Sequence, residues 1–394
     1  MRNLFIIIFL FVLFQNYQHS LANNKFVDSD KYPQINKSEH LFLMDQDTKQ
    51  VLLEKNADKR IAPSSMTKLM TAYVVFDQLK QGKLELDHQC LIGKDAWKKR
   101  GSRMFLNYGD VVDIDKLLTG LLVSSGNDAA VALAQATSGT IDKFSDLMNE
   151  YARKIGLKNS HFKNPHGLNQ NGHYMTLRDL SVLSSAITND FPEYSHYFVT
   201  PEFTYQNITQ KNRNPLIKSG YTGATGMKTG HTNAGGYGMV GTAIRGSRKL
   251  VAITNNANSA RQRGEITTEL LDYGFNDHKK IVVFGKDESI SSAKIWLGNK
   301  IKVDLVAKND VKINVTEEKY IEYFTIEIKY QEPIYAPIYK GQKIATMILR
   351  GGNNKIIETP LFAKENIDKA NYFARIHQIF KYQFYQFLRI IKNQ

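Results

Sequence analysis

The sequence contains a single cysteine, Cys90, in 394 residues. An intrachain disulfide is therefore impossible, and the stability of the fold has to come from its core. A lone cysteine is more often a small buried apolar residue than a nucleophile. The hydrophobic fraction of 42% can fill such a core, which excludes a chain that is disordered throughout.

The signatures of several functional classes are also missing. The sequence has no zinc-finger or RNA-binding signature and no long block of Lys and Arg. Its net charge of +14 therefore fits an anionic envelope or membrane at least as well as nucleic acid, and no nucleic-acid partner is expected. Neither His-Glu-x-x-His nor Gly-x-Ser-x-Gly occurs, which argues against a metalloprotease and an α/β-hydrolase. We expect no metal and no organic cofactor.

The N-terminus has the pattern of a secretory signal peptide. Arg2 gives a positive start, residues 4–14 are almost wholly apolar, and Ser20-Leu21-Ala22 offers small residues for cleavage. This apolar run is short for a bilayer span. We therefore predict a signal peptide at 1–22 and export of the chain, with an uncleaved anchor as the alternative. Residues 23–37 are polar and are expected to form a flexible lead-in.

Residues 38–276 are expected to form one domain of helices and antiparallel strands. Residues 40–45 and 51–55 predict a hairpin, and apolar residues at helical spacing from Met66 to Val74 predict a helix with one buried face. Residues 115–155 are also helical in pattern, with a break at 124–127. Later stretches predict a helix at 177–187, antiparallel strands within 220–255, and a helix at 266–275.

Two further segments follow this domain. Short alternating runs predict a small β domain at 279–362. In residues 365–394, apolar side chains from Phe373 to Ile391 recur at helical spacing. Cations are supplied by Lys369, Arg375, Lys381, Arg389 and Lys392. That composition is typical of a helix lying in an anionic membrane interface. The alternative is a terminal helix packed on the body of the protein.

Ser65-Met66-Thr67-Lys68 carries the first chemical signal. It places a hydroxyl and an amine three residues apart, on one helical face. A serine becomes a good nucleophile when a base takes its proton, and a lysine can be that base when burial and a neighbouring cation lower its pKa. Ser-x-x-Lys also occurs at Ser160/Lys163 and Ser291/Lys294, so the motif alone is weak.

Two other motifs make the combination specific. Ser125-Gly126-Asn127 is the only Ser-x-Asn in the chain, and Lys228-Thr229-Gly230 is the only Lys-Thr-Gly. The first supplies a proton relay and an amide, and the second a cation, a hydroxyl and a glycine that lets a substrate approach the strand. A penicillin-recognising serine enzyme has these three motifs in this order.

With these motifs, the chain resembles the low-molecular-mass penicillin-binding proteins of the D-alanyl-D-alanine carboxypeptidase type, serine peptidase family S11. The resemblance runs from about His40 to the end of the chain and includes His166-Gly167-Leu168, residues 210–214 and residues 270–275. It implies an α+β fold with a β-lactamase/transpeptidase-like catalytic domain, a small all-β domain and a C-terminal amphipathic helix. The implied location is the periplasmic face of the cytoplasmic membrane, with peripheral attachment.

The resemblance also implies a role for each motif residue. Ser65 attacks the D-Ala-D-Ala carbonyl of a peptidoglycan stem pentapeptide, Lys68 is its base, and Ser125 passes a proton to the leaving amine. Asn127 orients the acyl part, and the backbone N–H groups of Ser65 and His231 form the oxyanion hole. The terminal carboxylate is bound by Lys228 and Thr229, and Gly230 lets the substrate approach the strand. β-Lactam antibiotics are expected to acylate Ser65.

One position departs from the family pattern. Carboxypeptidases of this type often carry an arginine on the strand after Lys-Thr-Gly, facing the substrate carboxylate. Alignment through Lys249-Leu250 puts Lys249 at that place, with Arg248 beside it. Lysine lacks the planar bidentate fork of arginine, so Lys249 is expected to bind the carboxylate more weakly or to share it.

Three alternatives to a carboxypeptidase stay open at this point. A β-lactamase shares the motifs, but Glu193 and Glu202, which precede Lys-Thr-Gly, lack an asparagine four residues later. A D,D-endopeptidase that cleaves crosslinks would carry the same motifs. A non-catalytic wall-binding protein would have no need of the intact motif side chains.

Overall fold

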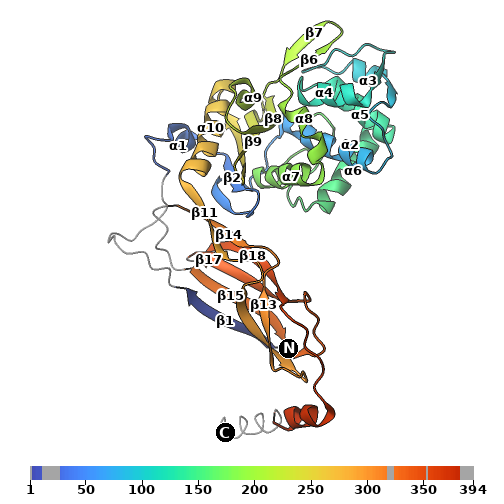
Figure 1. Cartoon of the computed structure of the whole chain (residues 1–394). Helices are drawn as coiled ribbons and strands as arrows, with labels where there is room; N and C mark the ends of the chain where they lie inside the picture. Colours follow the sequence, from blue (N-terminus) through green and yellow to red (C-terminus); the bar gives the residue numbers. More distant parts are fainter. Residues whose placement is uncertain (1, 11–26, 317–323, 352–353, 382–394) are drawn as a thin grey trace. The chain divides into compact units, whose positions relative to one another are not determined.

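The computed structural model describes residues 2–10, 27–316, 324–351 and 354–381. It divides into two compact units (Figure 1): Leu21–Asp277, and His278–Gln394 together with Met1–Ser20.

A five-stranded antiparallel sheet forms the centre of the first unit. Its strand order is β3-β2-β10-β9-β8. The strands are β2 (Leu41–Asp45), β3 (Val51–Lys55), β8 (Ala224–Thr232), β9 (Gly236–Arg245) and β10 (Arg248–Ala257). The pairing of β2 with β3 confirms the predicted hairpin, and β8, β9 and β10 confirm the antiparallel strands within 220–255.

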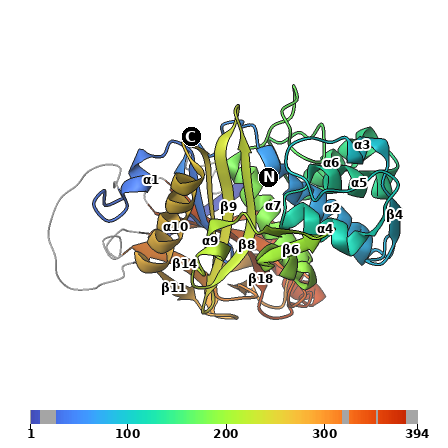
Figure 2. The same cartoon turned by 90° about the horizontal axis from the view of Figure 1, so that it is seen from above.

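Both faces of this sheet are covered. In β10, Leu250 and Ala252 belong to one hydrophobic cluster, whereas Val251 and Ile253 belong to another. This alternation follows from the two-residue period of a strand. Helix α10 (Ala260–Asn276) packs on β9 and β10, and α7 (Leu177–Asp190) also contacts β10. Figure 2 shows these two helices on opposite sides of the strands.

Helix α2 (Lys68–Lys80) is the central helix of the unit. It contacts α4 (Ile114–Leu122), α5 (Asn127–Ser138), α6 (Ile141–Lys154) and α7. All residues from Lys68 to Phe76 are buried, so the prediction of one buried face is wrong. A helix with neighbours on every side has no face left for solvent.

The predicted helical stretch 115–155 consists of α4, α5 and α6, and the predicted break lies between α4 and α5. Short elements complete the unit. They are α3 (Lys94–Trp97), β4 (Gln89–Leu91), β5 (Val111–Asp113), η2 (Pro192–Tyr194), α8 (His196–Val199), β6 (Glu202–Tyr205), β7 (Ile208–Lys211) and α9 (Pro215–Lys218).

The segment expected to be a flexible lead-in is ordered where the structure describes it. Helix α1 (Pro33–Lys37) packs against α10, and the side chains of Tyr32 and Ile35 are buried. The Glu269 carboxylate on α10 accepts hydrogen bonds from the backbone N–H groups of Gln34 and Ile35, at 2.8 and 3.0 Å. The expectation is therefore wrong for residues 27–37, because the buried side chains of Val27, Tyr32 and Ile35 are enough to dock a segment that is otherwise polar. Residues 23–26 lie outside the described residues.

The second unit is built from strands. One sheet has the order β1-β15-β17-β18-β13-β12-β16, and β11 pairs with β14 separately. The bounds are β1 (Arg2–Leu10), β11 (His278–Phe284), β12 (Ser289–Trp296), β13 (Lys302–Val306), β14 (Val311–Thr316), β15 (Phe324–Glu332), β16 (Ile334–Tyr335), β17 (Lys343–Gly351) and β18 (Asn354–Ala363). These strands enclose a core of their own.

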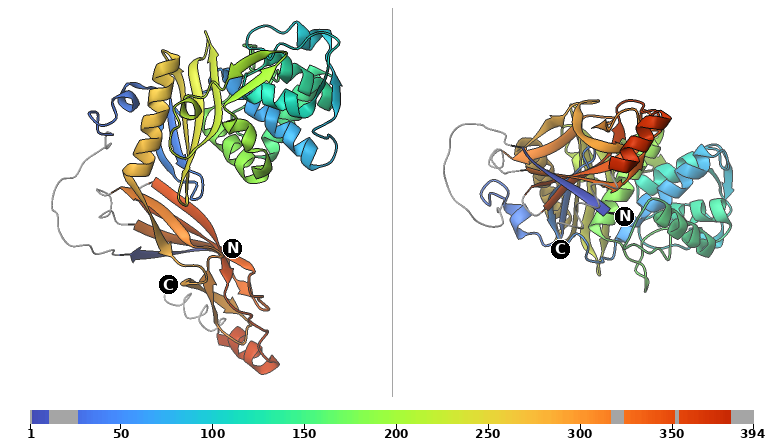
Figure 3. Two further views of the ribbon diagram at one scale, coloured as in Figure 1. Left: turned by 45° about the horizontal axis from the view of Figure 1, so that its top comes forward. Right: turned by 90° about the horizontal axis from the view of Figure 1, so that it is seen from below.

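The two ends of the chain belong to this β unit. Residues 2–10 of the predicted signal peptide form β1, an edge strand antiparallel to β15, and residues 11–22 lie outside the described residues. A helix covers 372–381, drawn in red in Figure 3, and the rest of the predicted tail helix, 382–394, also lies outside. No helix among the described residues is long and apolar enough to cross a membrane. The fold class predicted from the sequence, a mixed α+β domain followed by a β-rich domain and a helix, is confirmed.

Candidate active site

A single tight turn brings Ser65 and Lys68 together. Ser64–Thr67 form the 3-10 helix η1, which leads directly into α2. Residues three apart in a 3-10 turn lie above one another. The Lys68 Nζ atom consequently lies 2.9 Å from the Ser65 Oγ atom.

The Lys68 amine is completely buried and has two other partners. It donates hydrogen bonds to the Asn127 Oδ1 atom at 2.7 Å and to the His166 carbonyl oxygen at 2.8 Å. Burial, and to a smaller extent the nearby Arg213 cation, lower the pKa of Lys68 to about 7, although the Asp128 carboxylate opposes both effects. Close to neutral pH, Lys68 can therefore accept the Ser65 proton.

The second motif lies between α4 and α5. Ser125 has a φ of +61°, a conformation that non-glycine residues rarely adopt. Its Oγ atom accepts a hydrogen bond from the Lys228 Nζ atom at 2.9 Å. Because Asn127 begins α5, Ser125 and Asn127 both reach the site from the same turn.

The amide of Asn127 is fully engaged. Its Oδ1 atom accepts from Lys68, and its Nδ2 atom donates to the Arg100 carbonyl oxygen at 2.7 Å. This pairing fixes both the orientation of the amide and the position of the Lys68 amine. In this structure the Asn127 amide therefore positions the Lys68 amine.

The third motif supplies a buried cation on β8. Lys228 is buried, and its pKa lies well below the ordinary value because of burial and of the neighbouring cations Lys68, Arg213 and Arg263. Four basic side chains thus surround one small region, and Arg263, whose pKa is about 10, stays protonated at neutral pH. Such a field favours a bound anion.

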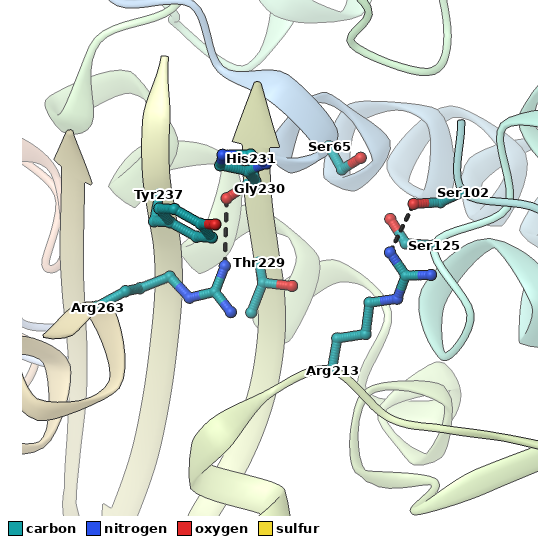
Figure 4. Close-up of a pocket in the computed structure, with 9 residues that line it drawn as sticks. All are labelled: Ser65, Ser102, Ser125, Arg213, Thr229, Gly230, His231, Tyr237 and Arg263. Atoms are coloured by element: carbon teal, nitrogen blue, oxygen red, sulfur yellow. Dashed lines mark hydrogen bonds between the residues drawn. The ribbon is translucent and has the colours of Figure 1, made fainter. Parts of the chain in front are cut away.

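A cavity of about 260 Å³ lies between these motifs. The residues that line it are Ser65, Ser102, Ser125, Arg213, Thr229, Gly230, His231, Tyr237 and Arg263, shown in Figure 4. None of these nine residues carries a carboxylate. Glu193 and Glu202, the acids considered for a β-lactamase, are not among them.

Four residues that line this cavity were not predicted from the sequence, namely Ser102, Arg213, Tyr237 and Arg263. Arg213 donates to the Ser102 Oγ atom, and Arg263 on α10 donates to the Gly230 carbonyl oxygen at 3.3 Å. Burial lowers the pKa of Arg263 to about 10. A signal for Arg213 was present in the family-like stretch 210–214, but Arg263 reaches the cavity only through the packing of α10 on the sheet.

The structure does not bring Lys249 to the cavity, and its assignment to the substrate carboxylate is wrong. Lys249 is exposed and pairs with Ile244, whereas the Gly230 end of β8 pairs with Gly238. Six residues separate Ile244 from Gly238 along β9, or about 20 Å at 3.4 Å per residue. Lys249 therefore lies at the end of the sheet that is remote from the cavity. Arg263, and not Lys249, is the basic residue that lines the cavity beside Gly230.

The other histidines have structural roles. The His173 Nδ1 atom accepts a hydrogen bond from the Lys163 backbone N–H at 3.1 Å, and its Nε2 atom lies 2.9 Å from the Thr67 Oγ1 atom. Burial lowers the pKa of His173 to about 4 and that of His166 still further. Both rings are neutral at neutral pH. No cluster of His, Cys, Asp or Glu suited to a metal occurs in the described part of the chain.

Comparison with known proteins agrees with this geometry. Residues 27–259 match the family model D-alanyl-D-alanine carboxypeptidase, peptidase S11. Residues 278–369 match the C-terminal domain of penicillin-binding protein 5. The D-alanyl-D-alanine carboxypeptidase DacC of Escherichia coli is 35% identical over 87% of this chain and 88% of its own length. A crystal structure of penicillin-binding protein 5 from Haemophilus influenzae has a TM-score of 0.75 and 32% identity, and covers 84% of this chain and 98% of its own.

The chain therefore belongs to the peptidase S11 family. It is a serine-type D-alanyl-D-alanine carboxypeptidase of peptidoglycan, and the expectation of a carboxypeptidase is confirmed.

The Asp128 carboxylate stabilises the backbone next to the site, and a substitution can test this role. Its two carboxylate oxygens accept from the backbone N–H groups of Met104, Phe105, Leu106 and Ala129, at 2.9 to 3.2 Å. In Asp128→Asn one oxygen becomes an NH₂ group that cannot accept, which strands two buried N–H groups. We expect a loss of about 2–4 kcal/mol of unfolding free energy, measured by denaturant titration. Asp146→Asn on the exposed face of α6 is the control, and equal stability of the two variants would contradict the role of Asp128.

Proposed function

We propose that Ser65 is the nucleophile of this carboxypeptidase and that Lys68 is its general base. The observation that carries the proposal is the completely buried Lys68 amine, with a pKa of about 7, at 2.9 Å from the Ser65 Oγ atom. A base whose pKa lies near the working pH is unprotonated in a large fraction of the molecules and still binds a proton strongly enough to remove it from the nucleophile. The other two Ser-x-x-Lys copies lack this support, since Ser160 donates to the Asp179 carboxylate and Ser291 lies on β12 of the β unit.

The reaction then proceeds by acyl transfer. Ser65 Oγ attacks the carbonyl between the two D-Ala residues, and its proton passes to Lys68. The backbone N–H groups of Ser65 and His231 bind the oxyanion, an interaction worth several kcal/mol. Ser125, which Lys228 holds at 2.9 Å, gives its hydroxyl proton to the leaving amine and takes in exchange the proton that Lys68 accepted. Lys68 is then neutral again, and D-Ala departs. Water then hydrolyses the ester on Ser65 and restores the enzyme.

The cations of the cavity bind the terminal carboxylate of the peptide. Arg213 and Arg263 both line the cavity, as do the Thr229 hydroxyl and Gly230, and Lys228 lies buried beside them. Burial makes the charge–charge attraction stronger than it is at an exposed surface. This placement selects substrates with a free C-terminus, as a carboxypeptidase requires.

Replacement of the nucleophile is the first test. In Ser65→Ala we expect release of D-Ala from a diacyl pentapeptide ending in D-Ala-D-Ala to fall at least about 1000-fold, because the covalent step is lost. Free D-Ala is the quantity to measure. Ser291→Ala, taken from another Ser-x-x-Lys copy, is the matched control and should keep full activity. Activity retained in Ser65→Ala would remove Ser65 from the mechanism.

β-Lactams provide a probe of the same serine. Penicillin-binding protein D2 from Listeria monocytogenes, solved in the ampicillin-bound form, is 28% identical, with a TM-score of 0.56 over 61% of this chain. We propose that β-lactams acylate Ser65 here, since they present a reactive carbonyl and a carboxylate to the same groups.

Acylation by a β-lactam should depend on pH through Lys68. Because the neutral amine is the base, the rate should rise about tenfold per pH unit below pH 7 and level off above it. In Arg213→Gln a cation that lowers the pKa of Lys68 is lost, so the midpoint should move to higher pH. Stopped-flow acylation between pH 5.5 and 9 measures both effects. A flat profile in the wild-type protein would eliminate Lys68 as the base.

We also propose that the chain is exported, is processed after a signal peptide at 1–22, and attaches peripherally to the periplasmic face of the cytoplasmic membrane. Residues 38–276 would carry the activity, 279–362 would form the β domain, and 365–394 would form the anchoring helix. The described helix at 372–381 supports this proposal. Its Phe373 and Phe380 side chains are 81% and 67% exposed, and Arg375 and Lys381 add cations.

Membrane attachment can be tested with vesicles that contain anionic lipid. Each buried phenylalanine contributes about 1.5–3 kcal/mol, so Phe373→Ser together with Phe380→Ser should weaken partitioning at least about 100-fold. Sedimentation with the vesicles measures the bound fraction. Leu91→Ser, which removes a side chain that is 73% exposed in the other unit, is the control. Equal binding of both variants would contradict an anchor at this helix.

A further inference from the structure

A second cavity, of about 450 Å³, lies beside the active site. Residues 60–62 line it on one side and residues 169–174 on another. Neither the three motifs nor the proposed mechanism uses it. It is therefore a candidate for a contact with a part of the substrate away from the scissile bond.

The second cavity is close to the first one, and residues 62–65 connect the wall of one with the wall of the other. Ala62 lines the second cavity and Ser65 lines the first, and three residues of chain span at most about 11 Å. Glycines pack against this wall. A Cβ atom on Gly167 would lie 1.8 Å from the Ser64 carbonyl oxygen, and one on Gly235 would lie 2.6 Å from the Ala62 carbonyl oxygen. Only glycine allows the backbone at these two positions to pack this closely on residues 62–64, so the chain between the two cavities is held firmly in place.

The residues that line the second cavity suit a negatively charged ligand that can also form hydrogen bonds. Asn169, Gln170 and Asn171 are exposed and bring carboxamide groups, and Arg60 brings a cation. No Asp or Glu is among the nine lining residues. The Arg60 guanidinium lies 4.3 Å from the centre of the Tyr174 ring, a stacking that holds it in place. Among the residues that the structure describes, Arg60 has no ion-pair partner.

The floor of the cavity is held rigidly. Ile61 forms an antiparallel bridge with Met175, and His161 forms one with Tyr174. The Asn164 Nδ2 atom donates to the Gln170 Oε1 atom at 3.0 Å, which orients that amide. His173 connects the floor to η1 through Thr67. A ligand in this cavity thus meets groups that are already placed, which reduces the entropy cost of binding.

We propose that this second cavity is a subsite for the segment of the stem peptide that precedes D-Ala-D-Ala, and that Arg60 binds a carboxylate of that segment. The inference rests on the proposed function, because it takes Ser65 as the point of attack. Residues two to four positions before the scissile bond lie roughly 7 to 14 Å from it in an extended peptide. That range includes the span of at most about 11 Å between Ala62 in the second cavity and Ser65 in the first. The subsite would therefore distinguish complete acidic stem peptides from short or neutral ones.

The test compares three substrates on the full-length wild-type and Arg60→Gln proteins. The first is a pentapeptide ending in D-Ala-D-Ala with a free side carboxylate three residues before the scissile bond. The second is the same peptide with that carboxylate amidated, and the third is diacetyl-Lys-D-Ala-D-Ala. For Arg60→Gln we expect kcat/KM to fall about fivefold on the acidic pentapeptide only, through KM, as for a single charged contact near the surface. Amidation should cause a similar loss in the wild-type protein and almost none in the variant.

Arg153→Gln, which removes an exposed cation from α6, is the matched control and should leave all three substrates unchanged. Equal kcat/KM of wild type and Arg60→Gln on the acidic pentapeptide would overturn the subsite, as would an equal loss on the tripeptide. A disaccharide-linked amidated peptide tests a sugar as the occupant. If the sugar improved kcat/KM in both proteins and the carboxylate did not, the subsite would be reassigned. Absence of tripeptide hydrolysis by the wild-type protein would count instead against the proposed function.

Discussion

The burial of one amine, that of Lys68, is the constraint on which the rest of the catalytic unit depends. An ammonium group removed from water is costly unless hydrogen bonds replace the lost hydration. Three acceptors from three parts of the chain do so here: Ser65, Asn127 and the His166 carbonyl. Each of them must be held in position, which requires η1, the turn between α4 and α5, and the loop at 166–168. The geometry of the site therefore depends on the same packing that buries α2.

Much of this arrangement could be predicted from the sequence, because it is local. The hairpin of β2 and β3 follows from alternation and a turn, and Ser65 and Lys68 meet because they are three residues apart. The errors concern properties that arise only when elements pack together. Periodicity could not show that α2 is covered on all sides, since a helix buried everywhere and an amphipathic helix share the same apolar positions.

The two arginines illustrate the same limit at the site. Lys249 was assigned to the substrate carboxylate by alignment with the family pattern. The register of β10 on β9 instead places it about 20 Å from the Gly230 end of β8. Arg263 lies 33 residues after Gly230 in sequence, yet donates to its carbonyl oxygen because α10 packs across β9 and β10. No local pattern marks such a residue. Arg263 can be assigned to the cavity only when the register of the sheet and the packing of α10 on it are known.

The positive charge of the cavity serves binding and chemistry together. Arg213 lowers the pKa of Lys68 and Lys228 and lines the cavity that the substrate carboxylate would enter. In the free protein, burial and the Arg213 cation lower the pKa of Lys68 to about 7, so a large fraction of the amine is neutral near pH 7. A bound carboxylate would offset part of that field and so favour the protonated form of Lys68, which forms when Ser65 loses its proton. The same charges therefore prepare the base before binding and, once the carboxylate has bound, lower the cost of its protonation.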